Sequence, residues 1–249
     1  MVGKLKLKKA WLLWAAMPFL LSAFRCGDDE QVEYVEMAFM LPFNMGPSPG
    51  KLINGTDMKK GDTLWLDIDF SDSLLEFHSG RRYKVKGLDF KLAISILNFL
   101  YPEKFIGEQR SATADFDFVQ KKGEVTFIGE TYSDLLFEYS QDRYRFKLGL
   151  IPNRPGIYFF NFVTPGYHEY PKREILNDYV IGLEESESGV RRVAVYDDFL
   201  ITVNEGRNNR NLAKASNNQF AEYMNIDPIV RYKVYYPTVS GSYTIRVVE

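Results

Sequence analysis

Apolar and polar residues alternate in short stretches along most of the chain, which predicts a mainly β protein. The clearest stretch follows Gly61-Asp62. Every second residue from Leu64 to Phe70 is apolar, and Asp67 and Asp69 fall between them. This period of two places one face of a strand in a core and the other in water, as in an antiparallel sheet with one wet side.

Thirteen stretches carry this pattern. The predicted strands are Val32–Met40, Thr63–Phe70, Tyr83–Lys86, Phe90–Phe99, Ala114–Val119, Glu124–Ile128, Leu135–Tyr139, Arg143–Leu150, Ile157–Val163, Asp178–Leu183, Arg192–Val203, Val230–Tyr236 and Ser242–Val248. So many short strands predict an antiparallel sandwich or barrel.

Three segments interrupt the strands. Leu41–Gly61 and Thr164–Glu174 are rich in Pro and Gly, which predicts long loops. The polar, Asn-rich segment Arg207–Tyr223 predicts one short surface helix from about Asn209 to Met224, ending before Pro228. The body, residues 32–249, forms one domain or two units that divide near residues 164–174.

The N-terminus has the layout of a secretory signal peptide. Four lysines lie within the first nine residues, and the stretch from Ala10 to Phe24 is almost wholly apolar. About 15 apolar residues fall short of the roughly 20 that a membrane-spanning helix needs. A signal peptide over residues 1–25 is therefore favoured over the alternative, a retained membrane anchor.

Cys26, the only cysteine, lies just after this apolar run, separated from it by Arg25. Its position resembles that of the lipidated cysteine of bacterial lipoproteins, which becomes the N-terminus after cleavage. Arg25 departs from the small residue that usually precedes that cysteine. Asp28, Asp29 and Glu30 resemble the acidic tether of Bacteroidetes lipoproteins, which directs them to the cell surface. That resemblance implies a lipid-anchored outer-membrane protein. A merely solvated tether is the alternative.

Removal of residues 1–25 takes five basic groups and no acid, so the charge becomes 26 minus 33, or −7. This balance argues against nucleic acid or anionic lipid as the main partner. With 45% apolar and 15% aromatic residues, the chain has ample material for a core.

Two further resemblances concern the body. Pro155-Gly156-Ile157-Tyr158 and Ser240-Gly241-Ser242-Tyr243 resemble the strand entries of immunoglobulin-like surface domains, where a Tyr bonds back across the turn. This resemblance implies an antiparallel, immunoglobulin-like β-sandwich. An ordinary Gly turn before an aromatic strand is the alternative. Residues 61–99, which begin Gly-Asp-Thr-Leu-Trp, also resemble uncharacterised Bacteroidetes lipoproteins, and these imply no activity.

Candidate catalytic and metal-binding groups are few. The only histidines, His78 and His168, fall in Gly-containing turns or loops, and no Gly-x-Ser-x-Gly elbow accompanies them. Asp67, Asp69 and Asp72 are weak candidates for calcium, although alternating Asp residues usually face water. No cofactor and no enzymatic activity are expected. A glycan-acting enzyme is the least favoured alternative, because no pair of acids stands out.

The remaining lead is aromatic. Tyr167, Tyr170, Tyr235 and Tyr236 are candidates for stacking on sugars or anchoring a partner protein, while packing within the sheet is the simpler interpretation. The sequence therefore leaves two classes of function. One is a surface lipoprotein that binds a ligand or protein, and the other is a structural or accessory β-domain.

Overall fold

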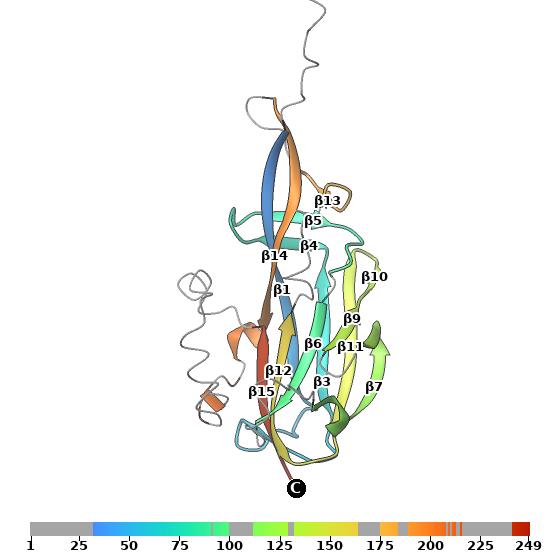
Figure 1. Ribbon diagram of the computed structural model, residues 1–249, viewed down its shortest axis with the longest axis vertical. Helices are drawn as coiled ribbons and strands as arrows, with labels where there is room; N and C mark the ends of the chain where they lie inside the picture. Colours follow the sequence, from blue (N-terminus) through green and yellow to red (C-terminus); the bar gives the residue numbers. More distant parts are fainter. Residues whose placement is uncertain are drawn as a thin grey trace, which may run out of the picture. The chain divides into compact units, whose positions relative to one another are not determined.

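Figure 1 shows a computed structural model of the chain. The structure describes residues 32–90, 92–99, 112–128, 132–163, 175–183, 189–207, 209, 211–212, 215 and 241–249. The chain divides into two units, one of Met1–Val35 with Glu184–Val193 and one of Glu36–Leu183 with Ala194–Glu249. In the first unit, Arg192 Nε donates to Glu33 Oε2 at 2.8 Å.

One sheet has nine strands. Its main path is β10-β11-β3-β1-β4-β5-β13, with β14 also paired to β1 and β7 to β11 (Figure 1). These strands are β1 (Val32–Pro47), β3 (Leu64–Ser71), β4 (Ser73–Glu76), β5 (Arg82–Val85), β7 (Phe116–Lys122), β10 (Glu138–Ser140), β11 (Arg143–Pro152), β13 (Val180–Ile181) and β14 (Arg191–Val203).

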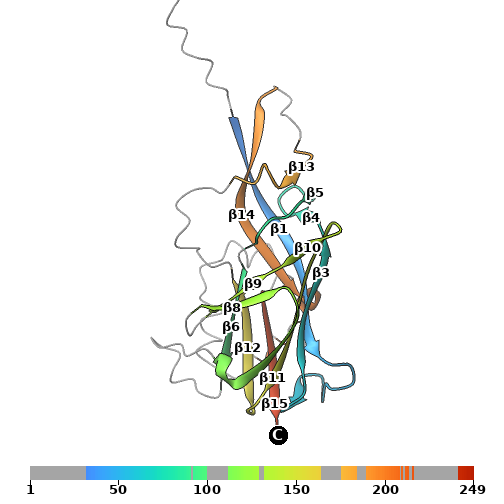
Figure 2. The ribbon, with the colours of Figure 1, turned by 90° about the vertical axis from the view of Figure 1, so that its right-hand side faces the viewer.

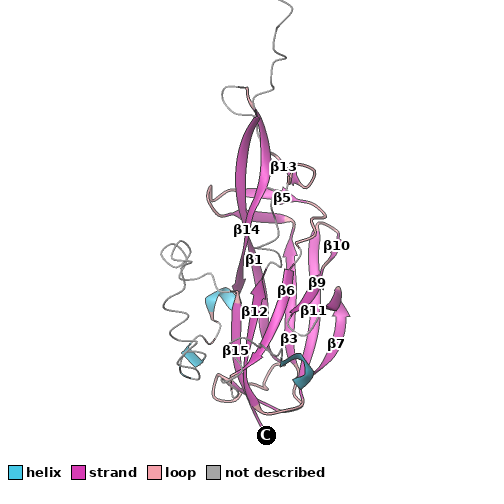
Figure 3. Cartoon of the chain, in the orientation of Figure 1, coloured by secondary structure: helices cyan, strands magenta, loops and turns pink. Residues whose placement is uncertain are grey.

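A second sheet has six strands in the order β2-β15-β12-β6-β9-β8. They are β2 (Asp57–Lys59), β6 (Leu92–Asn98), β8 (Glu124–Ile128), β9 (Tyr132–Leu136), β12 (Gly156–Val163) and β15 (Ser242–Val248). Only the β2–β15 pair is parallel among the pairs with a given register. Figure 3 shows how far strands dominate the described chain, with short helical turns at η2 (Ala112–Asp115) and η3 (Asn204–Gly206). The predicted β-sandwich is confirmed.

Aromatic rings fill the space between the sheets. Phe43 of β1 meets Phe162 of β12 edge-on at 5.2 Å between ring centroids, and Phe90 meets Phe199 of β14 at 4.9 Å. Each of these rings is less than 9% exposed. Because offset and edge-to-face aromatic pairs bury much area with a defined geometry, they fix the distance between the layers.

The chain crosses between the sheets at Phe137. The sequence predicts one strand from Leu135 to Tyr139, whereas the structure ends β9 in the second sheet and begins β10 in the first (Figure 2). The Phe137 ring lies between, 5.8 Å from Phe90 and 5.7 Å from Phe146. Strands that bend at a corner are a known way to join two packed sheets.

The predicted loop Leu41–Gly61 is wrong at both ends. β1 continues to Pro47, with Leu41, Phe43 and Met45 buried in alternation, and β2 lies inside the predicted loop. Pro42 falls between the part of β1 that pairs with β4, at Phe39 and Met40, and the part that pairs with β3, from Asn44, so neither register needs the N–H that it lacks. β4 was also not predicted, since Glu76 interrupts its apolar pattern.

The other predicted strands that lie among the described residues are present. Glu124–Ile128 and Ser242–Val248 have the predicted ends, as β8 and β15, and the rest have shifted ends. The predicted strand Val230–Tyr236 and most of the predicted helix Asn209–Met224 lie outside the described residues. Within the described part of the chain, no helix is both long and apolar enough to cross a bilayer.

Candidate functional site

Most residues singled out from the sequence lie outside the described part of the chain. They are Cys26, Asp28, Asp29, Glu30, Tyr167, His168, Tyr170, Tyr235 and Tyr236. The lipidation, tether and aromatic-binding hypotheses therefore stay predictions.

Asp67 and Asp69 form ion pairs across two neighbouring strands. Asp67 Oδ2 lies 2.5 Å from Lys147 Nζ, and Asp69 Oδ1 lies 2.6 Å from Arg143 Nε. Lys147 is directly opposite Asp67 in the register of β11 and β3. These acids therefore serve as exposed partners for cations, and a calcium site at Asp67, Asp69 and Asp72 has no geometric support. Among the described residues, no three acidic, His or Cys side chains are placed to hold a metal.

Asp72 is itself buried and belongs to a different group, whose other members are partly exposed. Its carboxylate accepts a hydrogen bond from Tyr139 Oη at 2.9 Å, and Lys84 Nζ lies 3.8 Å away. Lys84 also donates to Asp142 Oδ2 at 3.0 Å. Burial, together with the hydrogen bond to Asp72, raises the pKa of Tyr139 to about 12. The group joins β5 to the β10–β11 hairpin and so acts as a structural tie.

Glu76 organises the turn that contains His78. Its carboxylate accepts hydrogen bonds from the backbone N–H groups of His78 at 2.9 Å, Ser79 at 2.6 Å and Ala38 at 3.3 Å. Burial alone would raise the pKa of Glu76, but these bonds and one from the Ser79 side chain outweigh it, so the pKa is lowered. The exposed His78 therefore sits in a structural turn beside an acid that is already fully engaged.

The predicted tyrosine corner is present at Tyr158. Its hydroxyl lies 3.2 Å from the carbonyl oxygen of Arg154, four residues upstream, and 3.1 Å from Asp115 Oδ2. The ring is fully buried. Tyr243, in the second such segment, is buried in β15, and burial raises its pKa to about 12. The finer immunoglobulin-like assignment stays a prediction.

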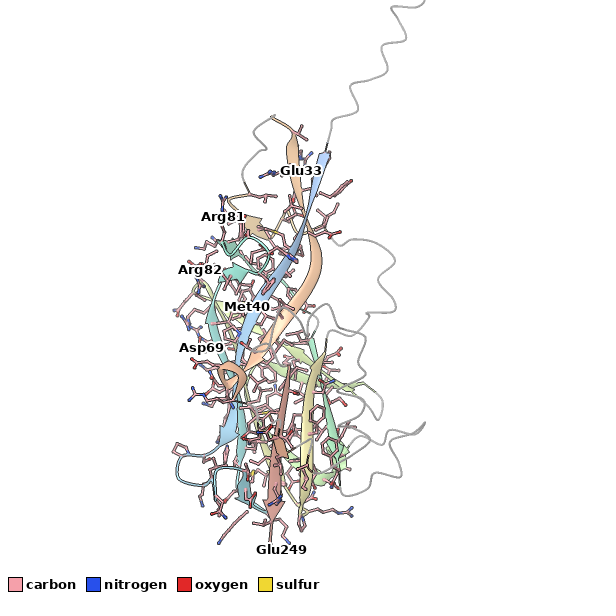
Figure 4. All side chains as sticks on the ribbon, turned by 90° about the vertical axis from the view of Figure 1, so that its left-hand side faces the viewer. Glu33, Met40, Asp69, Arg81, Arg82 and Glu249 are labelled. Carbon is pink, nitrogen blue, oxygen red and sulfur yellow. The ribbon has the colours of Figure 1, made fainter. Side chains whose placement is uncertain are left out.

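Exposed cations gather at β5, a feature that the sequence pattern alone did not single out. We call this surface the β5 face, formed by Arg82, Lys84, Lys86 and the neighbouring Ile181 of β13, with the exposed Arg81 adjoining it just before the strand. Figure 4 labels Arg81 and Arg82 beside each other. The run Arg-Arg-Tyr-Lys-Val-Lys was the signal, because it alternates cations with Tyr83 and the buried Val85.

Register fixes which side chains share the β5 face. Arg82 is opposite Leu75 of β4, and Lys84 is opposite both Ser73 of β4 and Ile181 of β13. Arg82 and Lys84 are two residues apart on one strand, so they project to the same side. Ile181 is 50% exposed beside them. The surface therefore combines cations with exposed apolar area.

Comparison with known proteins adds nothing to this picture: no protein-family model, curated protein or solved structure matches the chain.

Proposed function

We propose that this chain is a lipid-anchored, non-catalytic lipoprotein of the bacterial outer membrane that binds a ligand or partner protein at the membrane surface. The observation that carries the proposal is the position of Cys26. It is the only cysteine, and only Arg25 separates it from the end of a short apolar run, which a basic segment precedes.

The chemistry of that position supports lipidation over other roles. A lone cysteine cannot form an intramolecular disulfide. One acyl chain holds a protein at a bilayer marginally, whereas two or more hold it stably, because each buried methylene contributes about 0.8 kcal/mol. The acidic residues Asp28, Asp29 and Glu30 favour a cell-surface destination through their resemblance to the Bacteroidetes tether.

The described polar groups support a binding or accessory body. Acids that are buried or half-buried serve the fold: Glu76 holds a turn, Asp72 ties a hairpin, and the half-buried Asp115 contacts the tyrosine corner. A catalytic acid needs a lone pair or proton directed at a substrate. These three carboxylates are instead engaged with their own chain.

The test of anchoring compares the native chain with Cys26→Ala in cells fed labelled palmitate, followed by membrane fractionation and mass analysis of the N-terminus. We expect the native chain to carry label and to begin at Cys26. Cys26→Ala should carry no label and keep residues 1–25. Ser22→Ala is the matched control and should behave like the native chain. Label on the Cys26→Ala chain, or an unlabelled native chain that retains its leader, would refute anchoring through Cys26.

The destination is tested separately with the triple change Asp28→Asn, Asp29→Asn and Glu30→Gln. If these acids direct the chain to the surface, protease added to intact cells should degrade the native chain and spare the variant. Equal degradation of both would leave the acids as a solvated tether only.

A further inference from the structure

We propose that the β5 face docks on the phosphate headgroups of anionic lipids in the membrane that carries the anchor. The inference rests on the proposed function in that it assumes a lipidated Cys26. It adds an orientation, because one defined face of the body would lie against the bilayer.

The first argument is the concentration of positive charge. Residues 81–86 contain four cations and no acid, in a chain whose overall formal charge is −2. Arg81, Arg82 and Lys86 are exposed, and the Lys84 side chain is 40% exposed. A local cationic cluster on an acidic protein creates a field that the net charge conceals.

The acids that face this cluster leave it positive. Asp142 contacts Lys84 from the β10–β11 hairpin, and Asp72 lies beneath with its side chain only 5% exposed. The Arg82 guanidinium donates to the backbone carbonyl of Ser73 at 2.8 Å, which positions it without neutralising it. Both of these acids lie at Lys84, and the exposed Asp178 precedes Tyr179, whose carbonyl oxygen accepts from the Lys86 N–H at 2.9 Å. The excess of positive charge is therefore centred on Arg81 and Arg82.

The second argument is apolar and independent of charge. Ile181 is 50% exposed on the edge strand of the sheet, directly opposite Lys84, and Leu75 is half-buried opposite Arg82. Surfaces that lie on bilayers combine Lys and Arg with apolar side chains that enter the headgroup boundary. An open strand face with both features suits a lipid surface better than a recessed site for a small anion.

Tethering makes a weak contact sufficient. A lipid at Cys26, six residues before Val32, would hold the chain at the bilayer and so raise its effective concentration there. At such effective concentrations, an attraction of roughly 1 kcal/mol per cation produces a populated docked state. The acidic chain as a whole argues against anionic lipid as the main partner, and docking assigns lipid only this orienting role.

The experiment uses the full chain, purified from membranes with its anchor and reconstituted into vesicles. Ser73→Cys introduces a thiol on the β5 face for a fluorescent donor, and an acceptor dye is carried by the lipid headgroups. Because Cys26 is the only native cysteine, a lipidated chain labels at this new thiol alone. Labelling of the chain without Ser73→Cys would reveal a free Cys26, and so reports failure of the proposed function separately from docking.

We expect energy transfer to be higher in vesicles that contain phosphatidylglycerol than in phosphatidylcholine alone, and to fall in high salt as charge is screened. The double variant Arg81→Glu/Arg82→Glu should shift the docking equilibrium by roughly tenfold or more toward the free state. The matched control Lys121→Glu/Lys122→Glu makes the same charge change at exposed residues of β7. It should dock like the parent, and circular dichroism checks that both variants fold.

Equal transfer in neutral and anionic vesicles would overturn the proposal, as would undiminished transfer in Arg81→Glu/Arg82→Glu. If the β5 face does not bind phosphatidylglycerol vesicles but binds poly-glutamate, its partner is an acidic protein, and this result also overturns the proposal.

Discussion

The Asn204 side chain substitutes for a neighbouring strand at Met45. Its Oδ1 accepts from the Met45 N–H at 2.9 Å, and its Nδ2 donates to the Met45 carbonyl at 2.6 Å. Asn204 has a φ of 50°, followed by 55° at Glu205 and 86° at Gly206. Three successive left-handed residues are unfavourable on their own, since only Gly and occasionally Asn or Asp adopt this conformation readily.

Asn204→Ala removes both hydrogen bonds and places a Cβ-only residue at positive φ. Because the buried Met45 would be left with an unpaired N–H and carbonyl, we expect the free energy of unfolding to fall by about 2–4 kcal/mol. Asn204→Asp keeps the acceptor for the Met45 N–H but turns a carboxylate oxygen toward the Met45 carbonyl oxygen, so it should also be less stable than the native chain near neutral pH. Urea denaturation measures the difference, and a native-like Asn204→Ala would show that the paired bonds contribute little.

Tyr158→Phe tests the tyrosine corner. The ring stays, but the contacts of its hydroxyl with the Arg154 carbonyl and Asp115 are lost. We expect a loss of about 1–2 kcal/mol, typical of a buried hydrogen bond whose partners lose their donor. Tyr34, which is 54% exposed, supplies the control, and Tyr34→Phe should change stability by less than about 0.5 kcal/mol. If the two variants lose similar free energies of unfolding, the tyrosine corner does not stabilise the fold.

The strand pattern was predictable where one face is buried and the other wet. β3 follows this rule, with its apolar residues buried and Asp69 exposed. Tyr158 was also predictable, because a Gly turn before an aromatic strand has a known local geometry. Both are decided by residues close together in sequence, which is why the sequence alone was sufficient.

Features that depend on contacts between residues far apart in sequence could not be predicted in the same way. Nothing local marks Phe137 as the point where the chain leaves one sheet for the other, because its surroundings come from Phe43, Phe70, Phe90 and Phe146. The β5 face was missed for a related reason. Its composition was readable, but the pairing of Lys84 with Ile181 joins residues nearly a hundred positions apart.

Gly123 links β7 in the first sheet to β8 in the second, and there are two reasons why this position needs a residue without a side chain. Its φ is 70°, and an added Cβ would lie 2.5 Å from the Leu136 carbonyl oxygen. Gly50 has a similar φ of 78° but open space around it. Gly50→Ala should therefore lose about 1–2 kcal/mol from backbone strain alone. Gly123→Ala should lose a further 1–3 kcal/mol, roughly, from overpacking against backbone. Thermal or urea unfolding of the two variants gives the comparison, and equal losses would mean that the corner at Phe137 shifts freely.

The lowered pKa of Glu76 predicts how the free energy of unfolding changes at acid pH. Glu76 has this lowered pKa in the folded chain, so its contribution is present above the unfolded value of 4.5 and is lost as pH falls through the folded pKa. Glu76→Gln should cost about 1–3 kcal/mol near neutral pH, because one amide oxygen replaces two carboxylate oxygens that accept several bonds. Below pH 4.5 the native chain loses stability while the variant lacks this particular dependence, so the two curves converge. Urea midpoints measured across this range for the native chain, Glu76→Gln and the exposed control Glu205→Gln provide the test. Parallel curves for the native chain and Glu76→Gln would assign acid sensitivity to other carboxylates.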